Sequence, residues 1–336
     1  MTIIIVGDWE YEFYEKALYD GFKSLGNKVY KFSTADFMKY PSGSVLKNFL
    51  SRNSEINIVN KKLIEYVKHI QPELIFFQRP VFIRKETLSE ISNNSKAMLF
   101  SYHNDNPFDT IKNRLRNYHY IKSLNNYNLN FVYRPSNLSD IKKYSEKPAK
   151  VLKPYYVYDL HNAMTKSIHR EIDVIFVGHY EKFRDEYCKY LGQAGIKLEV
   201  VGPDWKNSKT INIDSIKYSA PVDSYEYVRL LNNSKIALAF LSKKNNDVYT
   251  RRNFEITAAG TFMLSERTEE LQEIFIEGKE CDYFSSKEEL LDKVNFYLKN
   301  SVAREKIASA GYEKCIRSGN SNIDRAKEII DTYKEL

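Results

Sequence analysis

The stretch YTRRNFEITAAGTFMLSERTEELQEIFIEGKE, residues 249–280, decides how the rest of the chain is read. Apolar residues recur at helical spacing after Arg251 and Arg252, Gly260 ends the run, and residues 261–264 form a short apolar segment. This order predicts a helix that ends at a glycine and leads into a buried strand. Glu255 follows the two arginines by four and three residues, so the three side chains share one helix face.

These three charged residues allow two interpretations. On a solvated helix face they pair with one another, which is common at these spacings. At the start of a helix, the N–H groups are unpaired and the dipole is positive. Two arginines there would form an anion site, and a carboxylate one turn further on would accept hydrogen bonds from hydroxyls. A diphosphate joined to a ribose is one ligand that fits the second interpretation.

The same stretch resembles the C-terminal signature of the CgeB-like (spore maturation protein) glycosyltransferases, which are similar to glycosyltransferase family 4. The signature has an arginine before a Phe-Glu pair, small residues with a glycine, a Thr-Glu-Glu-Leu turn and a Gly-Lys-Glu. Here these are Arg252, 254–255, 258–260, 268–271 and 278–280. The resemblance runs from about residue 172 to the C-terminus and is weaker in the N-terminal half. It implies the GT-B fold, which has two Rossmann-like α/β domains facing a cleft.

The resemblance also implies a donor site in the C-terminal half. Family 4 enzymes carry two acids in the pattern E-x7-E, of which the second binds the donor ribose and the first lies near the sugar. Here Glu255 matches the second acid, and Asp247 stands eight residues before it. Arg252, together with Arg251, would neutralise the diphosphate.

A loop after the first strand of the C-terminal domain lies near the donor in glycosyltransferases of this type. In this chain it holds Gly178 and His179, and Arg184 follows on the next predicted helix. His179 would contact the phosphates. Arg184 is equally consistent with a residue on the helix surface.

The N-terminal half begins with a βαβ pattern. Residues 2–6 (TIIIV) are apolar on both faces, as in a buried parallel strand, and end at Gly7 and Asp8. Helical spacing over 13–25 and a strand over 28–32 follow. Gly7 and Asp8 are therefore expected at the carboxyl edge of a sheet, on the acceptor side.

A second polar segment, SYHNDNPFD at residues 101–109, follows a strand predicted over 97–100. Ligands of open α/β sheets bind beyond the carboxyl ends of the strands, so His103, Asn104 and Asp105 are candidate site residues. The alternative is a turn whose Asp and Asn side chains bond their own backbone. Asp105 or His103 would be the base of an inverting enzyme. Many CgeB-like sequences have two consecutive acids where this chain has Asn104 and Asp105.

The domain boundaries follow from a repeated pattern. Residues 172–178 (IDVIFVG) repeat the strand-then-glycine opening of residues 3–7. We predict an N-terminal acceptor domain over 1–155 and a C-terminal donor domain over 171–318. The resemblance implies that a last helix within 319–336 crosses back to the N-terminal domain.

Composition limits the location and the partners. The chain has 336 residues and a net charge of +7, without the roughly 20-residue apolar run of a membrane-spanning helix. Three widely spaced cysteines and the lack of a signal-peptide pattern favour the cytoplasm. The basic segment 45–52 (VLKNFLSR) is either a surface turn or a peripheral contact with the inner face of a membrane. Nucleic-acid motifs are absent from the sequence.

These observations lead to one expected function and two alternatives. We expect transfer of a sugar from a nucleotide-diphosphate sugar, with UDP as the expected nucleotide. The acceptor would be a glycan, a lipid-linked molecule or a protein in the synthesis of a cell-surface polysaccharide or glycoconjugate. No cofactor and no metal are expected, because arginines and a helix start can replace a metal. A nucleotide-sugar epimerase of the same fold would act without an acceptor. A non-catalytic module would only bind sugar, nucleotide or a partner.

Overall fold

A computed structural model describes residues 1–38, 53–161, 170–208 and 213–336 of the chain. The basic segment 45–52, a surface turn or a membrane contact by its sequence, lies outside these residues. The chain divides into two compact units. Unit 1 comprises Met1–Lys153 and Asn322–Leu336, and unit 2 comprises Pro154–Ser321.

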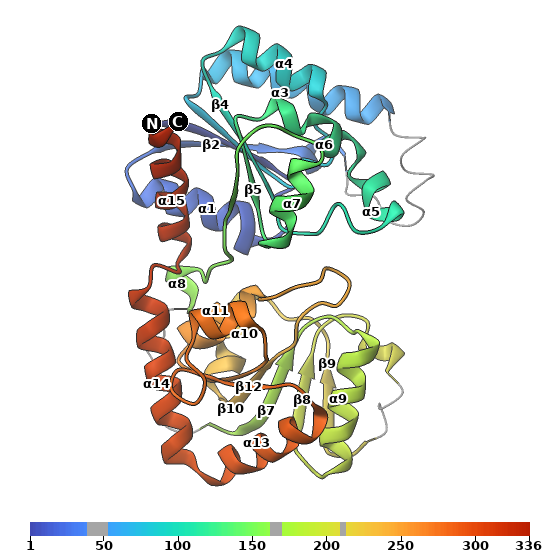
Figure 1. Cartoon of the computed structure of the whole chain (residues 1–336), viewed down its shortest axis with the longest axis vertical. Helices are drawn as coiled ribbons and strands as arrows, with labels where there is room; N and C mark the ends of the chain where they lie inside the picture. The colour runs from blue at the N-terminus through green and yellow to red at the C-terminus, as the bar shows by residue number, and fades with distance from the viewer. Residues whose placement is uncertain (39–52, 162–169, 209–212) are drawn as a thin grey trace. The chain divides into compact units, whose positions relative to one another are not determined.

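Unit 1 is built on a six-stranded parallel sheet in the order β2-β1-β3-β4-β5-β6 (Figure 1). The strands are β1 (Thr2–Gly7), β2 (Lys28–Ser33), β3 (Leu74–Gln78), β4 (Met98–His103), β5 (Leu129–Val132) and β6 (Ala149–Val151). The order reverses between β1 and β3, since β2 lies on one side of β1 and all later strands lie on the other. Such a switch point is where ligands bind in open α/β sheets.

Helices cover both faces of this sheet. They are α1 (Ala17–Ser24), α3 (Asn53–Ile70), α4 (Lys85–Asn94), α5 (Ile111–Arg116), α6 (Tyr118–Ser123), α7 (Ser136–Lys142) and α15 (Asn322–Glu335), with short turns at Glu12–Lys16, Thr34–Asp36 and Leu124–Asn126. The last helix, α15, packs beside α1 (Figure 1). Asn322 Nδ2 donates to the carbonyl of Ala17 at 2.7 Å. A Cβ at Gly21 would lie only 2.7 Å from the carbonyl oxygen of Asn322, so the glycine permits this close packing.

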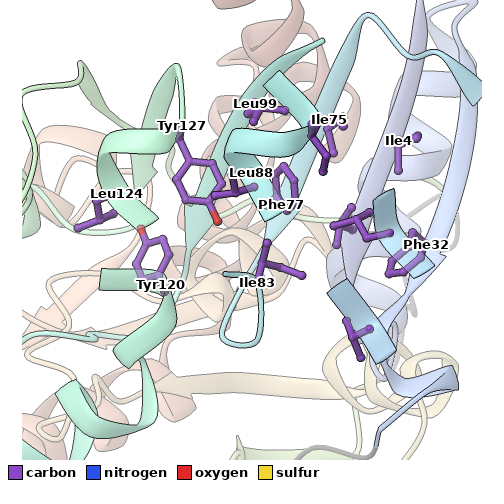
Figure 2. Close-up of a cluster of buried hydrophobic side chains, with 14 of the residues drawn as sticks. Ile4, Phe32, Ile75, Phe77, Ile83, Leu88, Leu99, Tyr120, Leu124 and Tyr127 are labelled. Carbon is purple, nitrogen blue, oxygen red and sulfur yellow. The ribbon is translucent and has the colours of Figure 1, made fainter. Parts of the chain in front are cut away.

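Alternate residues of the strands fill the two layers between sheet and helices, as the period of two requires. On one face, Ile75 and Phe77 join the buried cluster that Figure 2 shows, together with Leu88 of α4. On the other face, the ring of Phe76 lies 6.5 Å from that of Phe22 on α1. The apolar run of β1 is likewise buried on both sides, which is why it lacks polar alternation.

Unit 2 has a second six-stranded parallel sheet, in the order β12-β11-β10-β7-β8-β9 (Figure 1). The strands are β7 (Ile172–Val177), β8 (Leu198–Val201), β9 (Ile216–Ser219), β10 (Ser234–Ala239), β11 (Phe262–Glu266) and β12 (Asp282–Phe284). Here the order reverses between β7 and β10. The prediction of an α/β protein with two Rossmann-like parallel sheets is confirmed.

The helices of unit 2 are α8 (Tyr158–His161), α9 (Lys182–Gln193), α10 (Ser224–Asn232), α11 (Arg251–Ala258), α12 (Glu269–Ile274), α13 (Lys287–Lys299) and α14 (Ser301–Arg317), with a short turn at Trp205–Asn207. One face of the sheet packs on α9 and α13, with Phe176, Leu191 and Leu290 in the shared core. Helix α11 begins at the carboxyl edge of the sheet and leads into β11 through Gly260, whose φ is +67°. The glycine therefore ends the helix as the sequence predicted.

One predicted boundary is wrong, and one predicted helix differs in its first turn. The strand predicted over 97–100 continues to His103, because Tyr102 pairs with Gln78 of β3 and His103 with Val132 of β5. His103 is thus the last residue of a strand rather than part of the loop. The helix predicted over 13–25 begins as a π-helical turn at Glu12–Lys16 and becomes α1 only at Ala17.

Candidate functional site

The switch point of unit 2 holds an arginine against a glycine. Gly178 follows β7 directly, and Arg252 lies in the first turn of α11. A Cβ at Gly178 would be 3.3 Å from Nη2 of Arg252 and 2.7 Å from Cζ of Phe176. The guanidinium therefore lies close to the backbone of Gly178, directly after β7. Among the described residues Arg252 has no ion-pair partner.

The loop after β7 gathers further positive charge beside Arg252. Arg184 is buried, forms an ion pair with Glu181 at 2.9 Å and donates to the carbonyl of His179 at 3.0 Å. Burial lowers the pKa of Arg184 to about 10, with Arg252 adding to the effect, so the guanidinium stays charged at neutral pH. Partial burial of the ring, and the charges of Arg252 and Arg184, lower the pKa of His179. An anion at this edge would offset the repulsion between the guanidinium groups of Arg184 and Arg252.

The backbone at this edge is packed tightly enough to require two glycines. Gly202, after β8, has a φ of +149°, and a Cβ there would lie 2.2 Å from the carbonyl oxygen of Gly178. The indole Nε1 of Trp205 donates to that same carbonyl at 2.8 Å. The carbonyl of Gly178 is therefore turned into the protein.

Glu255 lies one turn further along α11 and is 1% exposed. Its Oε1 forms an ion pair with Nε of Arg251 at 2.8 Å and lies 3.6 Å from Nε2 of His161. Its Oε2 accepts from the hydroxyl of Tyr227 at 3.1 Å. Burial lowers the pKa of His161, and the negative charge of Glu255 opposes this shift only in part. The ring is therefore favoured in its neutral form. The two arginines thus differ, since Arg251 pairs with Glu255 and Arg252 turns to Gly178.

The start of α11 is fixed by a buried polar side chain. Oδ1 of Asn253 accepts from the backbone N–H of Thr250 at 2.7 Å, and its Nδ2 donates to Oγ of Ser265 on β11 at 2.9 Å. Asn253 thereby locks the first turn of the helix to the sheet. This contact holds the backbone of Arg251 and Arg252 in place.

The loop between β10 and α11 brings Asp247 to the same end of unit 2. The backbone N–H of Asp247 donates to the carbonyl of Ser242 at 3.0 Å. Glu266, at the end of β11, accepts from the backbone N–H of Leu241 at 2.5 Å and from Nζ of Lys243 at 2.7 Å. The donor-side residues predicted from the sequence therefore all belong to the carboxyl end of one sheet.

In unit 1 the switch point also carries charge. Asp8 follows β1, and Arg79 follows β3 with a φ of +48°. Arg79 lies 3.8 Å from a carboxylate oxygen of Asp8 and 3.8 Å from one of Asp105. The arginine thus links the first polar segment to the second. Sequence reasoning missed Arg79, because nothing in its local pattern showed that β3 lies next to β1.

The segment after β4 separates into buried and accessible parts. His103 is buried, with Nδ1 3.1 Å from the carbonyl oxygen of Asp105 and Nε2 2.8 Å from Oδ1 of Asn117. Burial lowers the pKa of His103 to about 4, so its ring is neutral at neutral pH. Asn104 is also buried, and its carbonyl accepts from Nη1 of Arg134 at 3.0 Å. Asp105 alone of the three presents a half-exposed side chain.

One further residue of unit 1 had no sequence signal. Glu15, on the π-helical turn, is 1% exposed, and its Oε1 accepts from the backbone N–H of Asp8 at 3.2 Å. A glutamate within an amphipathic helical pattern is ordinarily a surface residue. Its position depends on the π-helical turn and on Gly7, which no local pattern reveals.

Comparisons with known proteins agree with this architecture. Residues 184–331 match the family described as glycosyl transferase-like. No curated protein sequence matches the chain. Within the described residues, none of the helices combines the length and apolar character needed to cross a membrane.

Solved structures resemble the chain over its whole length. Sucrose-phosphate synthase from Thermosynechococcus elongatus has 12% identity and a TM-score of 0.73, over 100% of this chain and 99% of that one. HepE of Anabaena, in complex with UDP and glucose, has 12% identity and a TM-score of 0.68 over 100% of both chains. A glycosyltransferase from Rickettsia africae has 13% identity and a TM-score of 0.71, over 99% and 98%. The chain thus has the GT-B fold of glycosyltransferases, and its C-terminal half matches a glycosyl transferase-like family.

Proposed function

We propose that this protein transfers a sugar from a nucleotide-diphosphate sugar to an acceptor, and that UDP is the nucleotide. The observation that carries the proposal is Arg252, a guanidinium without an ion-pair partner among the described residues, over Gly178 at the switch point of unit 2. Its neighbour Arg184 adds a second guanidinium to the same edge, and the two arginines together lower the pKa of His179. A diphosphate leaving group gains negative charge as its bond to the sugar breaks, and fixed cations stabilise that charge.

Glu255 is the proposed ribose ligand, with Asp247 nearer the sugar. Both oxygens of Glu255 already have partners in Arg251 and Tyr227. A carboxylate oxygen accepts more than one hydrogen bond, so the ribose hydroxyls would add to these contacts. Because Glu255 is 1% exposed, they reach it only if a neighbouring side chain such as His161 moves.

The acceptor is assigned to unit 1, at Gly7, Asp8 and Asn104, with Asp105 as the base if the configuration inverts. His103 was the other candidate for that base, and its buried, neutral ring favours a role in holding Asp105 through the 3.1 Å contact to its carbonyl. We further propose that the reaction takes place in the cytoplasm on a glycan, lipid-linked or protein acceptor of the cell surface. The structure of HepE with UDP-glucose supports UDP as the nucleotide.

No metal enters this scheme, because the cations of unit 2 take the place that a divalent metal would hold on the phosphates. Adding magnesium is therefore expected to leave nucleotide affinity unchanged. An epimerase of the same fold is separated from a transferase by its products, because it would convert the donor sugar without any acceptor.

The test is a thermal-shift screen against UDP, GDP, dTDP, CDP and ADP, each with and without magnesium. A ligand that binds only the folded protein raises its melting temperature by mass action. We expect a shift with UDP that is independent of magnesium. If none of the five nucleotides produces a shift, the donor site proposed for unit 2 is wrong, and a non-catalytic binding protein becomes the better account.

A further inference from the structure

The carboxyl of Glu15 occupies an unusual position in unit 1. It lies against Gly7, where a Cβ would come within 2.1 Å of Oε1. Oε1 accepts from the N–H of Asp8, whereas Oε2 is buried and has no hydrogen-bond partner among the described residues. An apolar side chain would fill the same space without the penalty of an unsatisfied carboxyl oxygen. A buried, unsatisfied carboxyl beside a ligand-binding edge is a functional candidate for that reason.

The surroundings of Glu15 favour its neutral form. Burial, followed by the negative charge of Asp8, raises the pKa of Glu15 to about 7, and backbone hydrogen bonds together with the charge of Arg79 oppose the shift. Asp8 and Arg79 are the charged groups that face it, from the loop after β1 and the loop after β3. Near neutral pH Glu15 therefore changes between its protonated and its ionised form. Its neighbour in this position is Asp8, from whose backbone N–H it accepts a hydrogen bond.

Among the described residues whose charged side chains are at least partly accessible at the edge in front of Glu15, acidic side chains outnumber basic ones. Asp8 and Asp105 flank the guanidinium of Arg79, each with a carboxylate oxygen at 3.8 Å. Glu10 is exposed beside them, and its backbone N–H donates to Oδ1 of Asp8 at 3.2 Å. Tyr11 is 41% exposed, and the charges of Glu10, Arg79 and Asp8 act on its hydroxyl. An edge of this kind repels phosphate and carboxylate groups, whereas its carboxylates accept hydrogen bonds from hydroxyls and the tyrosine ring offers an apolar face.

We propose that this edge of unit 1 binds an uncharged sugar, the acceptor of the proposed reaction, and that Glu15 positions Asp8 for that contact. The proposal rests on the proposed function for the identity of the ligand as acceptor, and it adds the chemical class. Hydroxyls of the sugar would bond to Asp8 and Arg79, with the ring beside Tyr11. The negative charge of a sugar phosphate or a sugar acid would be repelled by Asp8, Asp105 and Glu10.

The proposal has a pH dependence with a definite sign. A bound sugar excludes water from Asp8, which weakens the solvent screening of the repulsion between Asp8 and an ionised Glu15. The sugar therefore binds more tightly to the protein with Glu15 protonated. Above about pH 7 the affinity should fall by up to about tenfold for each pH unit.

The experiment measures binding of two classes of probe by saturation-transfer NMR in the presence of UDP. The probes are methyl glycosides of glucose, galactose and N-acetylglucosamine, and the 6-phosphates of the same sugars. We expect at least one methyl glycoside to bind the wild type, with affinity falling between about pH 7 and about pH 8.5. We expect its 6-phosphate to bind at least about tenfold more weakly, because the carboxylates of Asp8 and Asp105 repel the phosphate.

Glu15→Gln keeps the shape and the acceptor atom for the N–H of Asp8, and is expected to bind the sugar with no change over this pH range. Glu12→Gln, an exposed glutamate on the same turn, is the matched control and should keep the wild-type profile. Should Glu15→Gln fold poorly, the carboxyl carbon resonance of Glu15 in the wild type replaces it. The pKa read from that resonance should rise when the sugar is added.

Three results would overturn the proposal. They are a 6-phosphate that binds as tightly as the methyl glycoside, no binding of any methyl glycoside, and a Glu15→Gln profile identical to that of the wild type. Loss of UDP binding with sugar binding intact would instead count against the proposed function. The two claims therefore fail in different ways.

Discussion

Replacing Glu15 by glutamine should stabilise unit 1, and by an amount that depends on pH. The pKa of Glu15 is about 7 in the folded protein, against an ordinary value of 4.5. The folded protein thus binds more protons than the unfolded chain between these values, and wild-type stability falls as the pH rises through this window. The loss is complete above about pH 7 and amounts to about 3 kcal/mol, because each unit of pKa difference corresponds to about 1.4 kcal/mol. Glutamine has no such loss.

The assay is urea unfolding at pH values from about 4.5 to about 8, the range that the pKa difference spans. Trp9 and Trp205 are the two tryptophans of the chain, so a Trp205→Phe background leaves Trp9 to report on unit 1. The difference in the free energy of unfolding between Glu15→Gln and its parent should grow by about 3 kcal/mol from the low end of the range to the high end. Glu12→Gln should show no such growth. A difference that stays constant with pH would refute the reasoning about Glu15.

Two further substitutions test the geometry of unit 2. Gly202→Ala places a methyl group 2.2 Å from the carbonyl oxygen of Gly178, at a φ of +149°, and should lower the stability of unit 2 by at least about 1–3 kcal/mol in denaturant unfolding. An unchanged midpoint would show that the loops after β7 and β8 are not packed as described. Asn253→Ala removes the acceptor for the N–H of Thr250 and should reduce stability by about 1–3 kcal/mol, with faster hydrogen exchange at the start of α11. Exchange as slow as in the wild type would mean that Asn253 does not fix this turn.

The sequence predicted those parts of the fold that depend on local patterns. The apolar run of β1 and its repeat at β7 were sufficient to predict two parallel sheets, because a short strand that is apolar on both faces is typical of a parallel sheet covered by helices. Gly260 likewise marked the end of α11 correctly. The helices α4, α5 and α6 were not predicted, since the polar composition of residues 85–123 gives only weak helical periodicity.

The candidate sites depend on contacts between distant residues, and this limited what could be predicted. Arg252 and Glu255 were found from one short motif, but the contact of Glu255 with His161 joins residues that are 94 positions apart. Arg79 and Glu15 reach Asp8 only because β3 pairs with β1 and because a π-helical turn precedes α1. Neither the pairing of β3 with β1 nor the π-helical turn is indicated by the local sequence. The roles of all these residues in binding stay predictions.

The most direct test of the central claim is a calorimetric titration of UDP into the wild type and Arg252→Ala. Arg229→Ala serves as the control, because Arg229 is an exposed arginine of unit 2 that pairs with Glu226. The account predicts that UDP binds the wild type and the control equally, and that Arg252→Ala binds it more weakly by about 1–3 kcal/mol, the range for a charged hydrogen bond. Equal affinity in all three proteins would contradict a donor site built on Arg252.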